Sequence, residues 1–148
     1  MFTDPARPPI EWLGGRHATS LRRRFGERWG RQEYWPRVWA ARGLLYVWRV
    51  EAEHSVLKGL TDPEWRVREM SAKVVRRREV ADTESALADL VADRAPRVRA
   101  AATRALARVG EAEHVPLVAG CAQDADPAVR RAAGAALLEL QRRLDICG

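Results

Sequence analysis

The sequence contains little cysteine and no long apolar run, and both absences exclude classes of protein. Cys121 and Cys147 are its only cysteines, too few for a disulfide framework and not spaced as paired metal ligands. No uncharged apolar stretch approaches the roughly 20 residues of a membrane-spanning helix. The first residues lack the basic and then apolar pattern of a secretory signal. We therefore expect a cytoplasmic protein without a membrane span.

Catalytic and metal-binding motifs are absent as well. The three histidines are His17, His54 and His114, and none is followed by glutamate. We do not expect His54 or His114 to bind a metal, because metal sites need several converging ligands. The sequence has no glycine-rich phosphate loop, zincin pattern or nucleophile elbow. It therefore predicts no catalytic residues, no cofactor and no metal.

What the sequence does contain is an internal repeat. Residues similar to those of the segment Ala95–Gly110 recur 31 positions earlier and 31 positions later. The matching columns are Val67, Val98 and Val129; Asp62, Asp93 and Asp124; Arg68, Arg99 and Arg130; and Val75, Leu106 and Leu137. A fixed period of this length with helical patterning indicates stacked helical units, each of which buries the apolar face of its neighbour.

Each unit is predicted to be a pair of helices. In the central unit the apolar residues follow the spacing of one helix face. They are Val98, Ala101, Ala102, Ala105, Leu106 and Val109. Second helices are predicted to begin at Asp62–Pro63, Ala95–Pro96 and Asp126–Pro127, and first helices near Glu51 and Glu111. Aspartate can cap a helix and proline suits its first turn, which is why the second helices are placed there.

The run Arg108–Leu137, RVGEAEHVPLVAGCAQDADPAVRRAAGAAL, resembles the HEAT repeat, and in particular the short bacterial subclass named after phycobilisome lyases. The positions that match the pattern of this repeat are Gly110, Val115, Pro116, Leu117, Asp126, Pro127, Val129, Arg130, Ala132, Ala133 and Leu137. The resemblance covers roughly residues 51–143. It implies an all-α fold, a right-handed α-solenoid of antiparallel helix pairs that usually presents a binding surface. Lyase activity is not implied, because many unrelated binding proteins share the repeat.

Charge and tryptophan divide the chain into a basic front and a neutral body. Residues 1–50 hold ten arginines against four acids, whereas bases and acids balance in residues 51–148. Five of the six tryptophans lie in the first 48 residues. We expect a poorly ordered segment at 1–15, a basic Trp-rich helical cap at 16–50, three HEAT-like repeats at 51–143 and a tail at 144–148. The cap includes a degenerate first repeat, Pro36–Arg49, whose text PRVWAARGLL aligns with that at Pro96 and so lies 29 residues before the next copy.

A basic stripe is the first candidate site. On a helical wheel a set of cations clusters on one flank of the predicted second helices, and one tryptophan lies beside it. The members are Arg37, Arg66, Lys73, Arg77, Arg97, Arg104, Arg108 and Trp65. If the second helices line a concave surface, this stripe suits an acidic protein or phosphates. The alternative is a solvated face neutralised by neighbours such as Glu69.

The basic aromatic front is the second candidate site. Its members are Arg22, Arg23, Arg24, Arg28, Trp29, Trp35 and Trp39. Interleaved arginines and aromatic rings can hold a nucleic-acid backbone and stack on bases. They can equally form a cap in which the rings seal the end of the stack and the arginines lie outside them. The sequence leaves both interpretations open.

The aspartate and arginine columns are interpreted as a structural ladder between units rather than as ligand contacts, because they recur in every unit. A narrower resemblance, DPEWRVREMSAKVV at 62–75, is to the DNA-alkylation-repeat glycosylases and would give Trp65 and Asp62 a role. Taken together, the sequence predicts a non-enzymatic adaptor or scaffold that binds a protein partner through its second helices. The alternatives are a nucleic-acid-binding protein and, after that, a glycosylase. The oligomeric state stays open.

Overall fold

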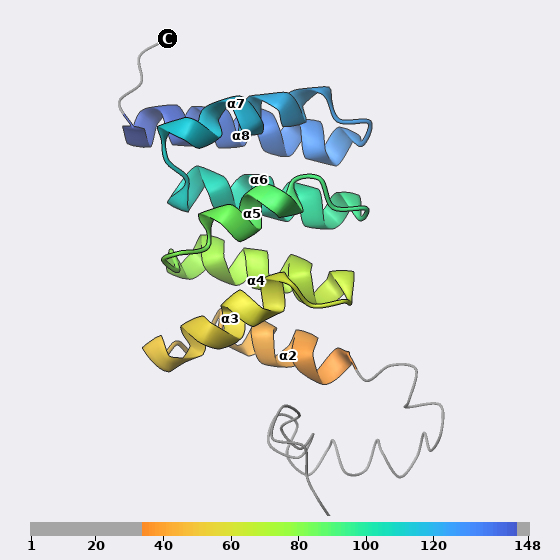
Figure 1. Ribbon diagram of the computed structural model, residues 1–148, viewed down its shortest axis with the longest axis vertical. Helices are drawn as coiled ribbons and strands as arrows, with labels where there is room; N and C mark the ends of the chain where they lie inside the picture. The colour runs from red at the N-terminus through yellow and green to blue at the C-terminus, as the bar shows by residue number, and fades with distance from the viewer. Residues whose placement is uncertain (1–33, 145–148) are drawn as a thin grey trace, which may run out of the picture.

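The computed structural model describes residues 34–144, and their regular secondary structure is helical throughout, with no strand among them (Figure 1). The α-helices are α2 (Trp35–Gly43), α3 (Glu53–Leu60), α4 (Trp65–Arg78), α5 (Glu84–Leu90), α6 (Pro96–Val109), α7 (Val115–Gly120) and α8 (Pro127–Leu144). Short 3-10 turns lie at Val50–Ala52, Ala112–His114 and Cys121–Gln123. The predicted segment 1–15, most of the predicted cap and residues 145–148 of the predicted tail lie outside the described residues.

The helices are arranged in two layers. In one layer α2, α4, α6 and α8 each pack on the next, and in the other α3, α5 and α7 each pack on the longer helix that follows them in the chain. The pairs succeed one another along the long axis, with α2 at one end and α7 and α8 at the other (Figure 1). The repeat in the sequence thus corresponds to one helix pair in the stack.

The recurring apolar columns form the interior. Val67, Val98 and Val129 are 3%, 0% and 0% exposed, which confirms that they occupy the same buried position in successive repeat units. Leu106 is completely buried, whereas its counterpart Leu137 in the last pair is only partly covered. Each Val or Leu side chain buried in this way contributes about 1.5–3 kcal/mol relative to an exposed one.

Two of the three predicted starts of the second helices agree with the structure. Helices α6 and α8 begin at Pro96 and Pro127. Helix α4 begins at Trp65 instead, the residue that the 31-residue period aligns with Pro96 and Pro127, whereas Pro63 lies two residues earlier in the preceding turn. That turn is alike in each unit, because Asp62, Asp93 and Asp124 each accept a hydrogen bond from the amide two residues on (2.9, 2.8 and 2.8 Å). Residues 44–49 of the predicted first repeat are not helical, since α2 ends at Gly43.

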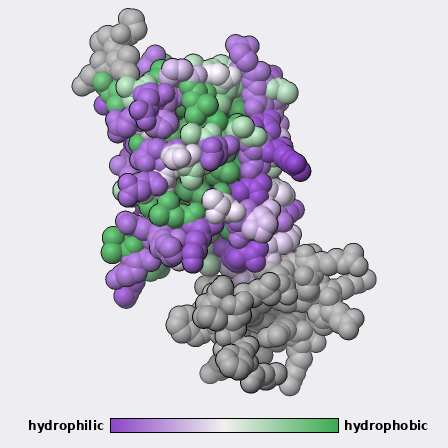
Figure 2. Space-filling view, viewed as in Figure 1, coloured by the Kyte–Doolittle hydropathy of each residue, from purple (hydrophilic) through white to green (hydrophobic). Residues whose placement is uncertain are grey.

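The surface is mixed in character. Figure 2 shows hydrophobic residues along the middle of one face of the stack, with hydrophilic residues on both sides of them. No helix within residues 34–144 is both long enough and apolar enough to cross a membrane.

Candidate binding surface

Ion pairs link each repeat unit to the next and account for the aspartate and arginine columns. In each pair an arginine donates from Nε and Nη2 to both carboxylate oxygens of an aspartate 25 residues further on, with Nε–Oδ2 distances of 2.7 Å. We call these pairs the ladder: Arg37–Asp62, Arg68–Asp93 and Arg99–Asp124. They confirm that the columns tie the units together, and they leave the aspartates engaged within the chain.

The ladder also changes the electrostatics of its carboxylates. The hydrogen bond from Arg99 holds the pKa of Asp124 below its ordinary value and raises the pKa of Arg99 itself. Burial acts to raise the pKa of Asp93, but the hydrogen bonds from Arg68 and the Ala95 amide, with the two nearby guanidinium charges, outweigh it and lower that pKa. Both aspartates are therefore ionised over the whole physiological range.

Arg37 belongs to this ladder and not to the basic stripe, which corrects its predicted placement. Its Nε lies 2.7 Å from Asp62 Oδ2, the same contact that Arg68 makes with Asp93. The spacing from Arg37 to Arg68 is 31 residues, so the true register of the first unit continues the regular period. Matching the Pro-Arg-Val text at Pro36 had instead placed Arg37 opposite Arg97.

Aromatic rings and arginines meet at the α2 end of the surface. The Tyr34 and Trp35 ring centroids are 5.3 Å apart, and those of Trp35 and Trp39 are 6.2 Å apart. The Arg66 guanidinium lies 4.5 Å from the ring centroid of Trp65 and within 6 Å of the rings of Tyr34 and Trp35. Trp39 is 41% exposed and the other rings are partly covered. Trp35 and Trp39 of the predicted front therefore share this cluster with Trp65, whereas Arg22, Arg23, Arg24, Arg28 and Trp29 lie outside the described residues.

Glu69 neutralises part of the stripe, as the alternative interpretation predicted. Its carboxylate is buried and lies 2.7 Å from Lys73 Nζ and 3.3 Å from Arg97 Nε. Arg97 also lies 5.8 Å from the ring centroid of Trp65. Glu69 thus fixes one cation of its own helix and one of the next, and these two charges are only partly available to a ligand.

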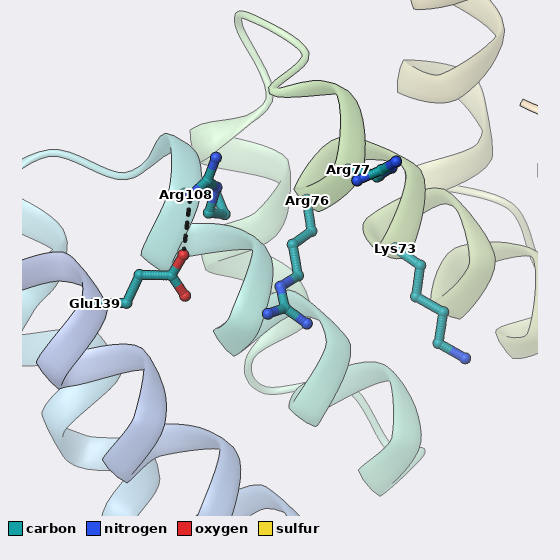
Figure 3. A pocket seen from close by; sticks show the side chains of 5 residues that line it. All are labelled: Lys73, Arg76, Arg77, Arg108 and Glu139. Atoms are coloured by element: carbon teal, nitrogen blue, oxygen red, sulfur yellow. Dashed lines mark hydrogen bonds and ion pairs between the residues drawn. The ribbon is translucent and has the colours of Figure 1, made fainter. Parts of the chain in front are cut away.

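Four cations surround an open hollow of about 470 Å³ between α4, α6 and α8, which we call the basic hollow. Its lining residues are Lys73, Arg76, Arg77, Arg108 and Glu139 (Figure 3). Arg108 pairs with Glu79 and, at 3.2 Å, with Glu139, and these hydrogen bonds raise its pKa. Arg76 and Arg77 are exposed and have no carboxylate partner within residues 34–144. Four cations and one acid therefore line the basic hollow, and two of the cations, Lys73 and Arg108, are also paired with Glu69 and Glu79 outside its lining.

A second hollow of about 320 Å³ adjoins the first, and Lys73 lines both. Arg97, Arg104, Asp126 and Glu69 are among its lining residues. Arg104 makes one long hydrogen bond, 3.4 Å, to the Ala100 carbonyl and lies near no carboxylate partner within the described part of the chain. The structure therefore groups Lys73, Arg77, Arg97, Arg104 and Arg108 along one continuous surface of α4 and α6.

Arg76 is the residue of this surface that the sequence analysis missed. It lies one period before Ala107, a buried position, so no column of the repeat pointed to it. The consecutive arginines at 76, 77 and 78 were the available signal. Arg78 has a structural role, because it donates to the carbonyls of Leu44 and Leu45 at 3.0 and 2.8 Å.

The residues considered for catalysis have structural partners. Asp62 accepts from Arg37 and from the Glu64 amide, so it presents no free carboxylate of the kind a glycosylase needs. His114 Nδ1 accepts from the Glu111 amide (3.0 Å) as part of a capping box. Within residues 34–144 no group of three or more His, Cys, Asp or Glu side chains is placed to hold a metal ion.

Comparison with known proteins identifies the family. No curated protein matches the chain. A model of HEAT repeats matches residues 53–139, the helix pairs from α3 to α8, and this span is more than half of the 148 residues. The chain therefore belongs to the HEAT-repeat family.

Proposed function

We propose that the protein is a non-enzymatic adaptor that binds an acidic segment of a protein partner along α4 and α6, the second helices of its first two regular pairs. The proposal includes the right-handed α-solenoid of antiparallel pairs that the sequence predicts. HEAT repeats commonly mediate protein interactions, so a binding role agrees with the family. The observation that carries the proposal is the basic hollow, where Arg76 and Arg77 offer guanidinium groups with no carboxylate partner in the described chain.

The shape of the surface favours a macromolecule over a small molecule. Small-molecule sites are enclosed and mostly apolar, with a few polar groups. Here both hollows are open, and the basic hollow is lined by charged side chains only. Exposed charges of this kind steer and orient an oppositely charged partner, which suits a peptide segment lying across the helices.

The distribution of acids favours a protein over nucleic acid. Glu69, Asp126 and Glu139 are interspersed among the cations of the two hollows. A phosphate backbone carries one negative charge per nucleotide, so acids interspersed among the cations repel it. Discrete carboxylates on a protein can instead be placed opposite the uncompensated cations only. The nucleic-acid alternative uses the stripe together with the rings of the basic aromatic front, and of the described rings of that front Trp35 is already covered in part by Arg66, whereas Trp39 is 41% exposed.

A binding titration with defined probes separates the two candidates. Fluorescence anisotropy would compare a labelled glutamate-rich peptide with single-stranded and duplex DNA at about 50 and 200 mM salt, because counterion release makes nucleic-acid binding fall steeply over that range. We expect the peptide to bind and the double variant Arg76→Ala/Arg77→Ala to bind it about tenfold more weakly, a loss of about 1.4 kcal/mol.

The matched control is Arg42→Ala/Arg94→Ala, which removes two exposed arginines whose side chains make no hydrogen bond or ion pair within residues 34–144 and do not line either hollow. Its affinity should stay close to that of the unmodified protein. Equal losses in both double variants would show that net charge alone attracts the peptide and would reject the proposed site. Preferential binding of DNA would replace the protein partner by nucleic acid.

A further inference from the structure

The outer face of α8 lacks the cover that the same face of α6 has. Leu138 is 67% exposed, whereas Ala107, at the equivalent position of α6, is completely buried. A Cβ on Gly134 would meet nothing within 4 Å, whereas its counterpart Thr103 is completely buried. Helix α8 packs on α6, and no element of residues 34–144 lies beyond α8 (Figure 1). Helix α8, the last helix within residues 34–144, thus carries the face that each earlier second helix uses to receive the next unit.

Arg130 on the same helix is held as the ladder arginines are, but it makes no ladder contact. Its Nη1 donates to the carbonyls of Asp124 and Ala125 at 2.7 and 2.8 Å. Arg68 and Arg99 hold their own turns in the same way, and their Nε and Nη2 then bind the aspartate of the next unit. For Arg130 no carboxylate of the described chain lies within ion-pair distance. Half of its guanidinium is therefore fixed and the other half is available.

We propose that the outer face of α8, made by Arg130, Gly134 and Leu138, docks a helix of another protein whose preceding turn carries an aspartate. The partner helix lies on α8 as α8 lies on α6. Its aspartate receives the Nε and Nη2 donors of Arg130, Gly134 lets the backbones approach, and Leu138 packs against the partner's apolar side chains. This surface shares no residue with the basic hollow, so it does not depend on the function proposed above.

The chemistry of the occupant follows from the ladder. A charge-assisted bidentate contact with Arg130 requires a carboxylate in the turn before the docked helix. In this chain Asp93 and Asp124 supply that carboxylate to Arg68 and Arg99. A second copy of the protein is the poorer candidate. Its three turn aspartates, Asp62, Asp93 and Asp124, are each already paired with an arginine of their own chain.

The test adds one unit to the full chain. A second copy of residues 110–140 inserted directly after Leu140 repeats the helix pair and places the copied Asp124 25 residues after Arg130, the spacing of the ladder. Covalent linkage brings the unit to an effective concentration of about millimolar or more, so a failure to dock cannot be assigned to weak affinity. Hydrogen exchange measured by mass spectrometry over residues 127–140 reports whether the face becomes covered.

We expect exchange in α8 to slow about tenfold, equivalent to about 1.4 kcal/mol of local stability. The extended chain should lose most of this gain when Asp124→Asn is made in the inserted copy. It should also lose most of it when Leu138→Asp is made in the original α8. Unchanged exchange in α8, or an equal gain with the Asp124→Asn copy, would overturn the proposal. Sedimentation velocity of the unextended protein gives a further outcome: a dimer that Leu138→Asp abolishes would assign the face to a second copy and overturn the proposed partner.

Discussion

Asp93 is the position where the ladder can be tested most directly. Its carboxylate accepts from Arg68 Nε at 2.7 Å, from Arg68 Nη2 at 3.1 Å and from the Ala95 amide at 2.8 Å. The Asp93 side chain is 6% exposed and that of Arg68 is 18% exposed. The substitution Asp93→Asn keeps the shape of the side chain and one oxygen but removes the charge. The contact between α4 and the turn before α6 is therefore weakened without a cavity.

The magnitude follows from the degree of burial. Hydrogen bonds to charged groups contribute about 1.5–3 kcal/mol, and breaking a fully buried ion pair costs about 3–5 kcal/mol. Arg68 is partly exposed and keeps its bonds to the carbonyls of Asp62 and Pro63, which reduces the cost of losing its partner. We therefore expect a loss of about 2–3 kcal/mol, which lowers Tm by about 6–10 °C in a domain of this size.

Urea unfolding followed by circular dichroism at neutral pH measures this loss. The control is Asp89→Asn on α5, which removes the same charge at an exposed position with no side-chain partner in the described chain and should change stability by less than about 0.5 kcal/mol. If Asp93→Asn is no more destabilising than Asp89→Asn, the ladder does not hold the repeat units together and the reasoning is wrong. Two separate unfolding transitions in the Asp93 variant would support it further, because stability in a repeat protein depends on the interfaces between neighbours.

Three further predictions concern the same stack. The lowered pKa of Asp93 means that its contribution is complete above the ordinary value of 3.8 and is lost as the pH falls through the folded-state pKa. The difference in unfolding free energy between wild type and Asp93→Asn should therefore be constant at neutral pH and shrink below about pH 4, and a difference that persists at about pH 2 would contradict this assignment. Gly59→Ala would place a Cβ 3.2 Å from Ser71 Cβ and closer still to Ser71 Oγ, so α3 and α4 must separate at a cost of about 1–3 kcal/mol. Chemical denaturation should show that Ser71→Ala in the Gly59→Ala background restores part of this loss. Leu106→Ala should cost about 2–5 kcal/mol and Leu137→Ala clearly less, because only Leu106 is covered from both sides, and equal losses in thermal unfolding would argue against the stack.

The interior of the stack could be predicted from the sequence because burial and position in the repeat coincide. A residue that faces the next layer does so in every unit, so Val67, Val98 and Val129 carry the same physical requirement and the same residue. The ladder was predictable for the same reason, since a contact between neighbouring units must recur with the period. The start of α4 was predicted two residues early because it was matched to the Asp-Pro text at Asp126 and not to the period, although the aspartate–amide bond and the helix starts at Trp65, Pro96 and Pro127 recur every 31 residues.

The candidate site was predictable only in part, because a binding surface need not repeat. The stripe was recognised where its cations recur, at Lys73 and Arg104 or at Arg77 and Arg108. Arg76 occupies a position that is buried in the next unit and was missed. Arg37 was misassigned because the match of PRVWAA to PRVRAA outweighed the period, although the ladder contact with Asp62 depends on spacing and not on the neighbouring text.

The ladder has a consequence for how such a chain can change its length. Every rung joins residues 25 apart, and rungs follow one another every 31 residues. Excising residues 80–110 would remove Asp93 and Arg99 together and bring Arg68 to the same distance from Asp124 that it now has from Asp93. A gain or loss of whole units therefore leaves each arginine of the ladder with an aspartate 25 residues further on, whereas a change of any other length between the arginine and the aspartate of one rung alters that spacing. Duplication and deletion in whole periods thus preserve the ladder, whereas a change in the length of a turn inside one rung does not.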